Sequence, residues 1–345
     1  MKQSDSFFST KKIHVSFLLA IMIFAIHISS LSNYNLTTSL GSKILFCDSI
    51  TMLIVNVAVP MFMILSAVMF YRNYSLEKTK DKYMSRVKTL VIPYLFWNFV
   101  WTMFQYICSY TFISNFFVGR EKAQFSLCDL LQGIFFYKYS PFWFIFDLIV
   151  FVALCPFIYT LLRNKWIGAI VIVLAAITCE SGYAFLEQVL FRRDVLVYYL
   201  IGAYVGIHFY DWFTRRKNQW ISIGALITCI AIIFYYKQPG NMLSYSFVNL
   251  CIITLYCLAF WWAFDMFPNK NYFSFEKESF LIYAMHINVS AIIAKLIYLL
   301  LPKQDFIAPV NYILTMVLTV TFISVFAYIV DRFIPKFRIL ISGGR

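Results

Sequence analysis

The stretch "FLLAIMIFAIHISS", residues Phe17–Ser30, is almost entirely apolar and contains one ionisable side chain, His27. It belongs to a longer apolar run, 13–31, which follows Lys11 and Lys12. About 20 apolar helical residues cross ~30 Å of hydrocarbon at 1.5 Å per residue, so this run is long enough to span a bilayer. It is longer than the apolar region of a signal peptide, and no small-residue cleavage site follows. We therefore expect a retained membrane helix.

The same composition extends over the whole chain. Of its 345 residues 61% are hydrophobic and 13% are charged, and the mean hydropathy is +0.75, which is outside the range of soluble domains. The sequence predicts an all-α fold, a polytopic transmembrane helical bundle of about ten spans. We expect one domain over 1–345, with 332–345 as a short cytoplasmic tail. The predicted spans are 13–31, 50–71, 89–113, 142–162, 166–180, 195–210, 219–236, 247–266, 279–301 and 310–331.

Most basic residues lie in the termini and in the loops between these spans. The formal net charge is +13, and 20 of the 29 Lys and Arg lie in the N-terminus, the even-numbered loops and the C-terminal tail. The positive-inside rule then predicts that both termini are cytoplasmic. We expect the basic loops to meet membrane lipids with anionic headgroups. Nucleic-acid binding is not expected, because no basic water-soluble domain is present to carry it.

Ionisable side chains within the spans are candidates for function, because such groups are costly inside a membrane, and we single out His27, Asp147 and His286. Counting residues from the expected inner surface places His27 about 21 Å along its helix, and Asp147 about 8 Å below the outer surface. We therefore place both in an outer layer, where Asp147 could orient His27 as a general base. A core histidine with only a structural role remains open. His286 is seven residues into its span, which predicts an inner layer with Arg86 and Lys88.

Several chemistries have no support in the sequence. There is no H-E-x-x-H, G-x-S-x-G or P-loop pattern, and four histidines spread over four segments predict no metal site. No C-x-x-C pair occurs, although a disulfide between Cys47 and Cys128 is open because both lie in loops on the same predicted side. The loop 114–141 contains "FSLCDLLQGIFF", which favours an amphipathic helix at the membrane interface.

Five stretches, in this order, resemble the polytopic integral-membrane acyltransferases of type three. They are "VPMFMILSAVMF" (59–70), "RVKTLVIPYLFW" (86–97), "PFWF" (141–144), "YYLIGAYVG" (198–206) and "SFLIYAMH" (279–286). Members of this family transfer acyl groups, usually acetyl, to extracytoplasmic sugars and envelope polymers. The resemblance covers nearly the whole chain.

The resemblance implies a catalytic role for His27, which matches the family histidine of the first span. The family usually has an Arg eleven positions earlier, and here that position is Ser16. Lys12 lies one helical turn before Ser16 and about 60° from the face of His27. A lysine side chain can extend about one turn along a helix. We expect Lys12 to supply the missing cation.

The resemblance also implies residues for an acyl donor. Arg86 matches the first Arg of a family R-x-x-R pattern, Thr89 replaces the second, and Lys88 is adjacent. A basic pair there suits the phosphates of a coenzyme A thioester. Trp143 and His286 match further family positions and are grouped with this donor site, although helix packing explains both equally well.

The function implied is transfer of an acyl group, acetyl by expectation, from cytosolic acyl-CoA to a hydroxyl of an envelope glycan, with His27 as general base. Acyl-CoA is a donor substrate, no bound cofactor is expected, and the location implied is a bacterial cytoplasmic membrane. Two alternatives remain open: a transporter or flippase for a saccharide, and a non-catalytic partner of glycan-synthesis proteins.

Overall fold

A computed structural model describes residues 2–28, 31, 34, 36–110, 126–179, 192–237, 246–267 and 271–344. All regular elements in these ranges are helical, which confirms the predicted all-α class. Seven of the described helices or joined helices are long and apolar enough to cross a membrane. An eighth is added if α7 (Trp143–Ala153) and α8 (Cys155–Leu162), bent by 66° at their junction, are one span.

Each of the ten predicted spans falls on helices, several of which begin earlier than predicted. The first span is α1 (Lys2–His27), and the second is the joined pair α2 (Ser39–Val55) and α3 (Ala58–Tyr71). Both begin eleven residues before the predicted span. Hydropathy marks only the apolar part of a helix, whereas backbone hydrogen bonding continues into polar flanks that favour helix. The orientation of the termini stays a prediction.

The chain divides into two compact units that interleave along the sequence. Unit 1 comprises Met1–Ile26, Ser42–Lys80 and Val150–Ser279, and unit 2 comprises His27–Gly41, Asp81–Ile149 and Phe280–Arg345. Besides the helices already given, unit 1 contains α9 (Lys165–Thr178), α11 (Arg193–His208), α12 (Tyr210–Thr214), α13 (Gln219–Lys237) and α14 (Phe247–Ala263). Unit 2 contains nearly all of α4 (Thr79–Arg86), then α5 (Ile92–Tyr110), α6 (Leu127–Phe135), α15 (Ser279–Leu300), α16 (Ile307–Phe333) and α17 (Pro335–Ser342).

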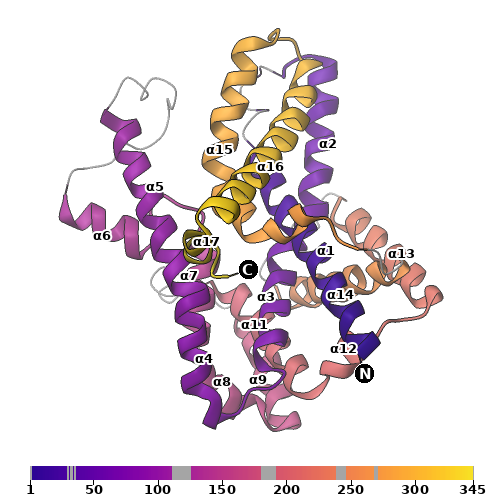
Figure 1. Cartoon of the computed structure of the whole chain (residues 1–345). Helices are drawn as coiled ribbons and strands as arrows, with labels where there is room; N and C mark the ends of the chain where they lie inside the picture. Colours follow the sequence, from indigo (N-terminus) through magenta and orange to yellow (C-terminus); the bar gives the residue numbers. More distant parts are fainter. Residues whose placement is uncertain are drawn as a thin grey trace. The chain divides into compact units, whose positions relative to one another are not determined.

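Unit 1 is organised around the contact of α3 with α11 (Figure 1). Gly202 and Gly206 of α11 are four residues apart and lie against the backbone of α3. A Cβ atom on Gly202 would be 2.5 Å from the carbonyl oxygen of Ile64, and one on Gly206 would be 2.8 Å from that of Val68. Small residues at this spacing let two helix backbones approach closely, as in G-x-x-x-G helix pairs.

In unit 2, α6 confirms a helix within "FSLCDLLQGIFF", and its buried face is the polar one. Asp129 is buried and accepts hydrogen bonds from Lys138 Nζ (2.7 Å), Tyr139 Oη (2.9 Å) and Tyr106 Oη (3.0 Å). Burial alone would raise the pKa of this carboxyl, but the hydrogen bonds and the charge of Lys138 outweigh it, so the pKa is lowered. This network of four polar groups thus holds α6 in place.

The opposite face of α6 is apolar and exposed. Leu127, Leu131 and Phe135 follow one another at four-residue spacing, and their exposed fractions are 72%, 43% and 47%. The buried Gly133 lies on the other face, directly against Thr102 of α5. This arrangement, with polar groups toward protein and apolar groups outward, suits a helix with lipid on its exposed side.

The segment predicted as a C-terminal tail forms the end of α16 and the helix α17. The indole of Trp97 in α5 donates a 2.8 Å hydrogen bond to the carbonyl oxygen of Ile341 in α17. Gly343 then ends α17 with a positive φ of 66°, and its Cα lies so close to Thr89 that a Cβ would clash. Cys47 and Cys128, for which a disulfide was left open, are both free thiols.

We expect Gly202→Val to destabilise the protein by about 1–3 kcal/mol, because a side chain there must push apart two packed backbones. Gly224→Ala is the matched control, since no atom lies within 4 Å of a Cβ built at Gly224 of α13. Thermal unfolding in detergent, followed by circular dichroism, measures both. Equal unfolding temperatures for Gly202→Val and the wild type would show that α3 and α11 do not need this close approach.

Candidate functional site

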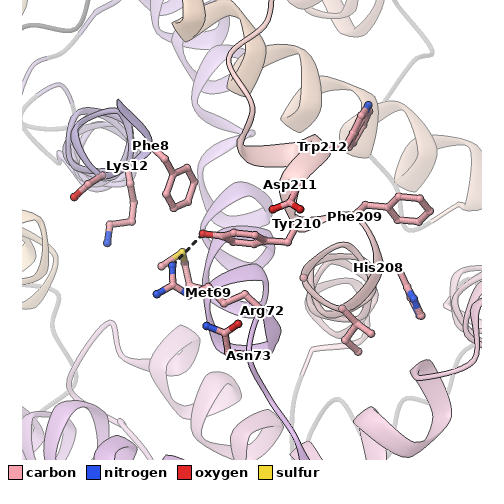
Figure 2. A pocket seen from close by; sticks show the side chains of 13 residues that line it. Phe8, Lys12, Met69, Arg72, Asn73, His208, Phe209, Tyr210, Asp211 and Trp212 are labelled. Atoms are coloured by element: carbon pink, nitrogen blue, oxygen red, sulfur yellow. Dashed lines mark hydrogen bonds between the residues drawn. The ribbon is translucent and has the colours of Figure 1, made fainter. Parts of the chain in front are cut away.

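Unit 1 contains a pocket of about 840 Å³ where three helix ends meet (Figure 2). It is lined by the early part of α1, the end of α3, and the residues that join α11 to α12. The glycine contact explains this convergence, because Gly206 lies in the pocket wall and holds the end of α11 on α3. Binding pockets for small molecules have volumes of about 300–1,000 Å³, so the pocket is large enough for a ligand.

Two cations from different helices line the pocket. Lys12 extends from α1 and Arg72 follows the last residue of α3 (Figure 2). Arg72 donates a 3.0 Å hydrogen bond from Nη1 to the hydroxyl of Tyr210, which uses one of its five N–H donors. Within the described ranges, Lys12 forms no ion pair and no hydrogen bond through its side chain. The pocket therefore presents positive charge that is not neutralised by direct pairing.

The remainder of the wall is mostly aromatic or polar. Phe8 packs edge-on against Tyr210, with ring centroids 6.1 Å apart, and Phe209 and Trp212 add two further aromatic rings to the lining. Asp211 is the one acidic residue in the lining. Guanidinium and ammonium groups bind phosphates, while aromatic faces bind planar bases, so the lining suits an anionic ligand with a flat apolar part.

Lys11, next to Lys12, is bound into the interior. Its Nζ lies 2.7 Å from Asp265 Oδ1, and the side chains are only 4% and 0% exposed. Nζ also lies 3.8 Å from the ring centroid of Trp261, and the backbone N–H of Lys217 donates to Asp265 Oδ2 at 2.9 Å. Burial lowers the pKa of the Lys217 ammonium, and the charge of Asp265 offsets this only in part. The pairing of Lys11 fixes α1 and leaves Lys12 on the pocket side.

In unit 2, the rings of His27 and His286 are in contact, with centroids 5.3 Å apart. His27 is the last residue of α1 and is exposed, whereas His286 of α15 is fully buried. This corrects the expectation that His286 belongs to an inner layer apart from His27. Counting residues assumed that every helix begins at one level and runs straight across, but α1 begins eleven residues before its apolar run.

Asp147 of α7 is buried, with 2% of its surface exposed. In the part of the chain that is described, no hydrogen bond or ion pair joins Asp147 to His27. The structure therefore brings His27 together with His286, and the orientation of His27 by Asp147 stays a prediction.

The remaining residues predicted for donor binding lie on three elements of unit 2. Lys88 is exposed in a π-helical turn, Val87–Val91, and the half-buried Arg86 directly precedes that turn. Trp143 begins α7 and packs edge-on against Phe144, with centroids 6.1 Å apart. Extra-wide helical turns are frequent at functional sites, so the position of Lys88 is compatible with ligand binding.

Arg72 is the residue that sequence reasoning did not single out. In the sequence it is one of six basic residues between the second and third predicted spans, with Lys78, Lys80, Lys82, Arg86 and Lys88, and topology alone explains such a cluster. Its position directly after an apolar helix was the available signal. Among the described residues, no group of three or more His, Cys, Asp or Glu is placed to hold a metal ion.

Comparisons with known proteins identify a family. A family profile described as an acyltransferase domain matches residues 17–328. Searches of curated proteins and of solved structures find no match. The matched range covers His27, Arg72 and His286, and it begins after Lys11 and Lys12.

We expect Lys11→Met to lower the free energy of unfolding by about 3–5 kcal/mol, because it leaves the buried carboxylate of Asp265 without its cation. Lys11→Met with Asp265→Asn should recover part of this loss, since the uncompensated charge is removed. Lys12→Met is the control and should change stability little. Thermal unfolding in detergent measures all three. A Lys11→Met protein as stable as the wild type would contradict the assigned structural role.

Proposed function

The chain belongs to the acyltransferase family whose domain matches residues 17–328, and on this premise we propose its reaction. It is a multi-pass membrane acyltransferase that moves an acyl group, acetyl by our proposal, from cytosolic acyl-CoA to a hydroxyl of an extracytoplasmic glycan. The observation that carries the proposal beyond the family is the pocket of unit 1, where Lys12 and Arg72 are available to an anionic ligand.

The donor would bind with its nucleotide end in this pocket. Its phosphates would contact Lys12 and the remaining N–H groups of Arg72, and its adenine would pack on the aromatic wall. Lys12 and His27 lie on one helix, fifteen residues and therefore about 22 Å apart along its axis. We therefore assign Lys12 to the phosphate end of the donor and not to the reacting thioester.

His27 would act as the general base. It removes the proton of the acceptor hydroxyl while the oxygen attacks the thioester carbonyl. The carbon–sulfur bond of the resulting intermediate then breaks, and the protonated His27 returns its proton to the leaving thiolate. The exposure of His27 at the end of α1 supports this role, because a glycan hydroxyl must reach the ring.

Arg86 and Lys88 remain the alternative site for the donor phosphates. Both lie in or beside an unusual helical turn, but neither lines the pocket. Two other function classes also remain as outcomes of experiment: movement of a saccharide across the membrane, and a non-catalytic role beside glycan-synthesis proteins. The experiments below separate these cases.

We expect Lys12→Met and Arg72→Gln each to weaken acetyl-CoA binding by about 10-fold or more, because each removes a charge-assisted hydrogen bond. Isothermal titration calorimetry of the detergent-purified protein measures the dissociation constant. S-acetylpantetheine, which lacks the phosphates, should lose no affinity in either variant. Arg86→Gln and Lys88→Gln are the matched controls. If acetyl-CoA binding is weakened only in Arg86→Gln and Lys88→Gln, the phosphate site is in unit 2 instead.

We expect His27→Ala to lower acyl transfer by about 100-fold or more while acetyl-CoA still binds, because a general base contributes on that scale. Transfer of radiolabel from acetyl-CoA to envelope glycan of the expressing cells measures the rate. Full transfer by His27→Ala would exclude its role as base. Saccharide movement in vesicles without any loss of thioester would instead support the transporter.

A further inference from the structure

The contact between His27 and His286 joins an exposed ring to a fully buried one. The exposed ring can meet a substrate, whereas the buried ring cannot. A lone exposed imidazole can carry its single proton on either nitrogen, so it needs a fixed neighbour to select the tautomer that works as a base. His286 is the neighbour that the structure places in ring contact.

The orientation of His286 is determined by its own helix. Its Nδ1 lies 2.7 Å from the carbonyl oxygen of Tyr283 and 3.1 Å from that of Ile282. A carbonyl oxygen only accepts, so Nδ1 carries a proton, and in the neutral ring the free electron pair is on Nε2. His286 is therefore able to accept a hydrogen bond through Nε2.

The turn of α15 that carries His286 is held from two sides. The indole of Trp101 in α5 donates a 2.8 Å hydrogen bond to the carbonyl oxygen of Ala284. The hydroxyl of Tyr283 donates a 2.6 Å bond to the carbonyl oxygen of Pro141. Both bonds are buried, and they limit movement of the backbone beneath the ring. A positioning residue needs this kind of support.

The distance between the rings suits a hydrogen bond. A bond of about 2.9 Å in line between two imidazole nitrogens places the ring centroids about 5 Å apart. The observed separation is 5.3 Å with an interplanar angle of 41°, and no hydrogen bond joins the two rings in the described structure. The exposed His27 ring would have to reorient to form the bond, and catalytic hydrogen bonds often tighten only when substrate binds.

We propose that His286 is a positioning residue that accepts a hydrogen bond from His27 and so fixes which nitrogen of His27 is the base. The proposal rests on the proposed role of His27 in acyl transfer. The free nitrogen of His27 takes the proton of the acceptor hydroxyl, and the opposite N–H of His27 stays bonded to Nε2 of His286. No proton passes to His286. The proton taken up by His27 leaves with the thiolate of coenzyme A.

The test compares His286→Gln with His286→Met. The two side chains have similar length, but only Gln can accept a hydrogen bond near the position of Nε2. Diethyl pyrocarbonate acylates the free nitrogen of an imidazole without needing the natural acceptor, and mass spectrometry gives the rate at His27. His208, which is in unit 1 and bonds to the carbonyl oxygen of Leu162, is the internal reference.

We expect His286→Met to slow the modification of His27 relative to His208 by about three-fold or more, because one hydrogen bond is lost. His286→Gln should recover at least half of the wild-type rate. With acetyl-CoA and envelope glycan as substrates, His286→Met should lower kcat and leave the KM for acetyl-CoA unchanged. Equal rates of His27 modification in the wild type, His286→Gln and His286→Met would overturn the proposal.

The proposal and the function on which it rests fail in different ways. Acyl transfer that survives in His27→Ala removes the base, whatever His286 does. Acyl transfer that is lost in His27→Ala but unchanged in His286→Met removes only the positioning role. If the Met variant does not fold, ¹⁵N shifts of histidine-labelled wild-type protein decide: a proton on Nε2 of neutral His286 would overturn the proposal.

Discussion

The close approach of α11 to α3 is the constraint on which unit 1 and its pocket depend. With hydrogen in place of a side chain at Gly202 and Gly206, the backbone of α11 lies directly on that of α3. The ends of these helices then carry Arg72 and His208 to a common space, where α1 adds Lys12. Lipid tails are as apolar as apolar side chains, so burial of these side chains does not drive association in a membrane. Close van der Waals packing is therefore the main attraction between membrane helices.

Two adjacent lysines illustrate how burial divides similar residues between structure and function. Lys11 is enclosed with Asp265 and Trp261, and breaking that pair would leave a buried charge. Lys12 projects from the same turn of α1 into the pocket. A helix rotates by about 100° per residue, so neighbours necessarily face different surroundings. The first lysine positions the helix, and the second is left for a ligand.

The histidine pair shows a similar division between two helices. His286 of α15 is buried, and its Nδ1 donates to backbone carbonyl oxygens, so the electron pair of the neutral ring is on Nε2. α1 ends at His27 and leaves that ring exposed. His286 can therefore be rigid while His27 is accessible. A base must be accessible to its substrate, and the residue that positions it must be rigid.

The sequence alone determined the helical class, the family and the candidate His27, whereas its count of about ten spans exceeds the seven or eight long apolar helices of the described structure. These depend on composition, on runs of about 20 apolar residues and on short motifs, all of which are local properties of the chain. Only the tertiary structure decided that Arg72 joins Lys12, that Lys11 does not, and that His286 contacts His27. Each of these depends on where a helix begins, on its rotation and on its tilt, and hydropathy carries no information about any of them.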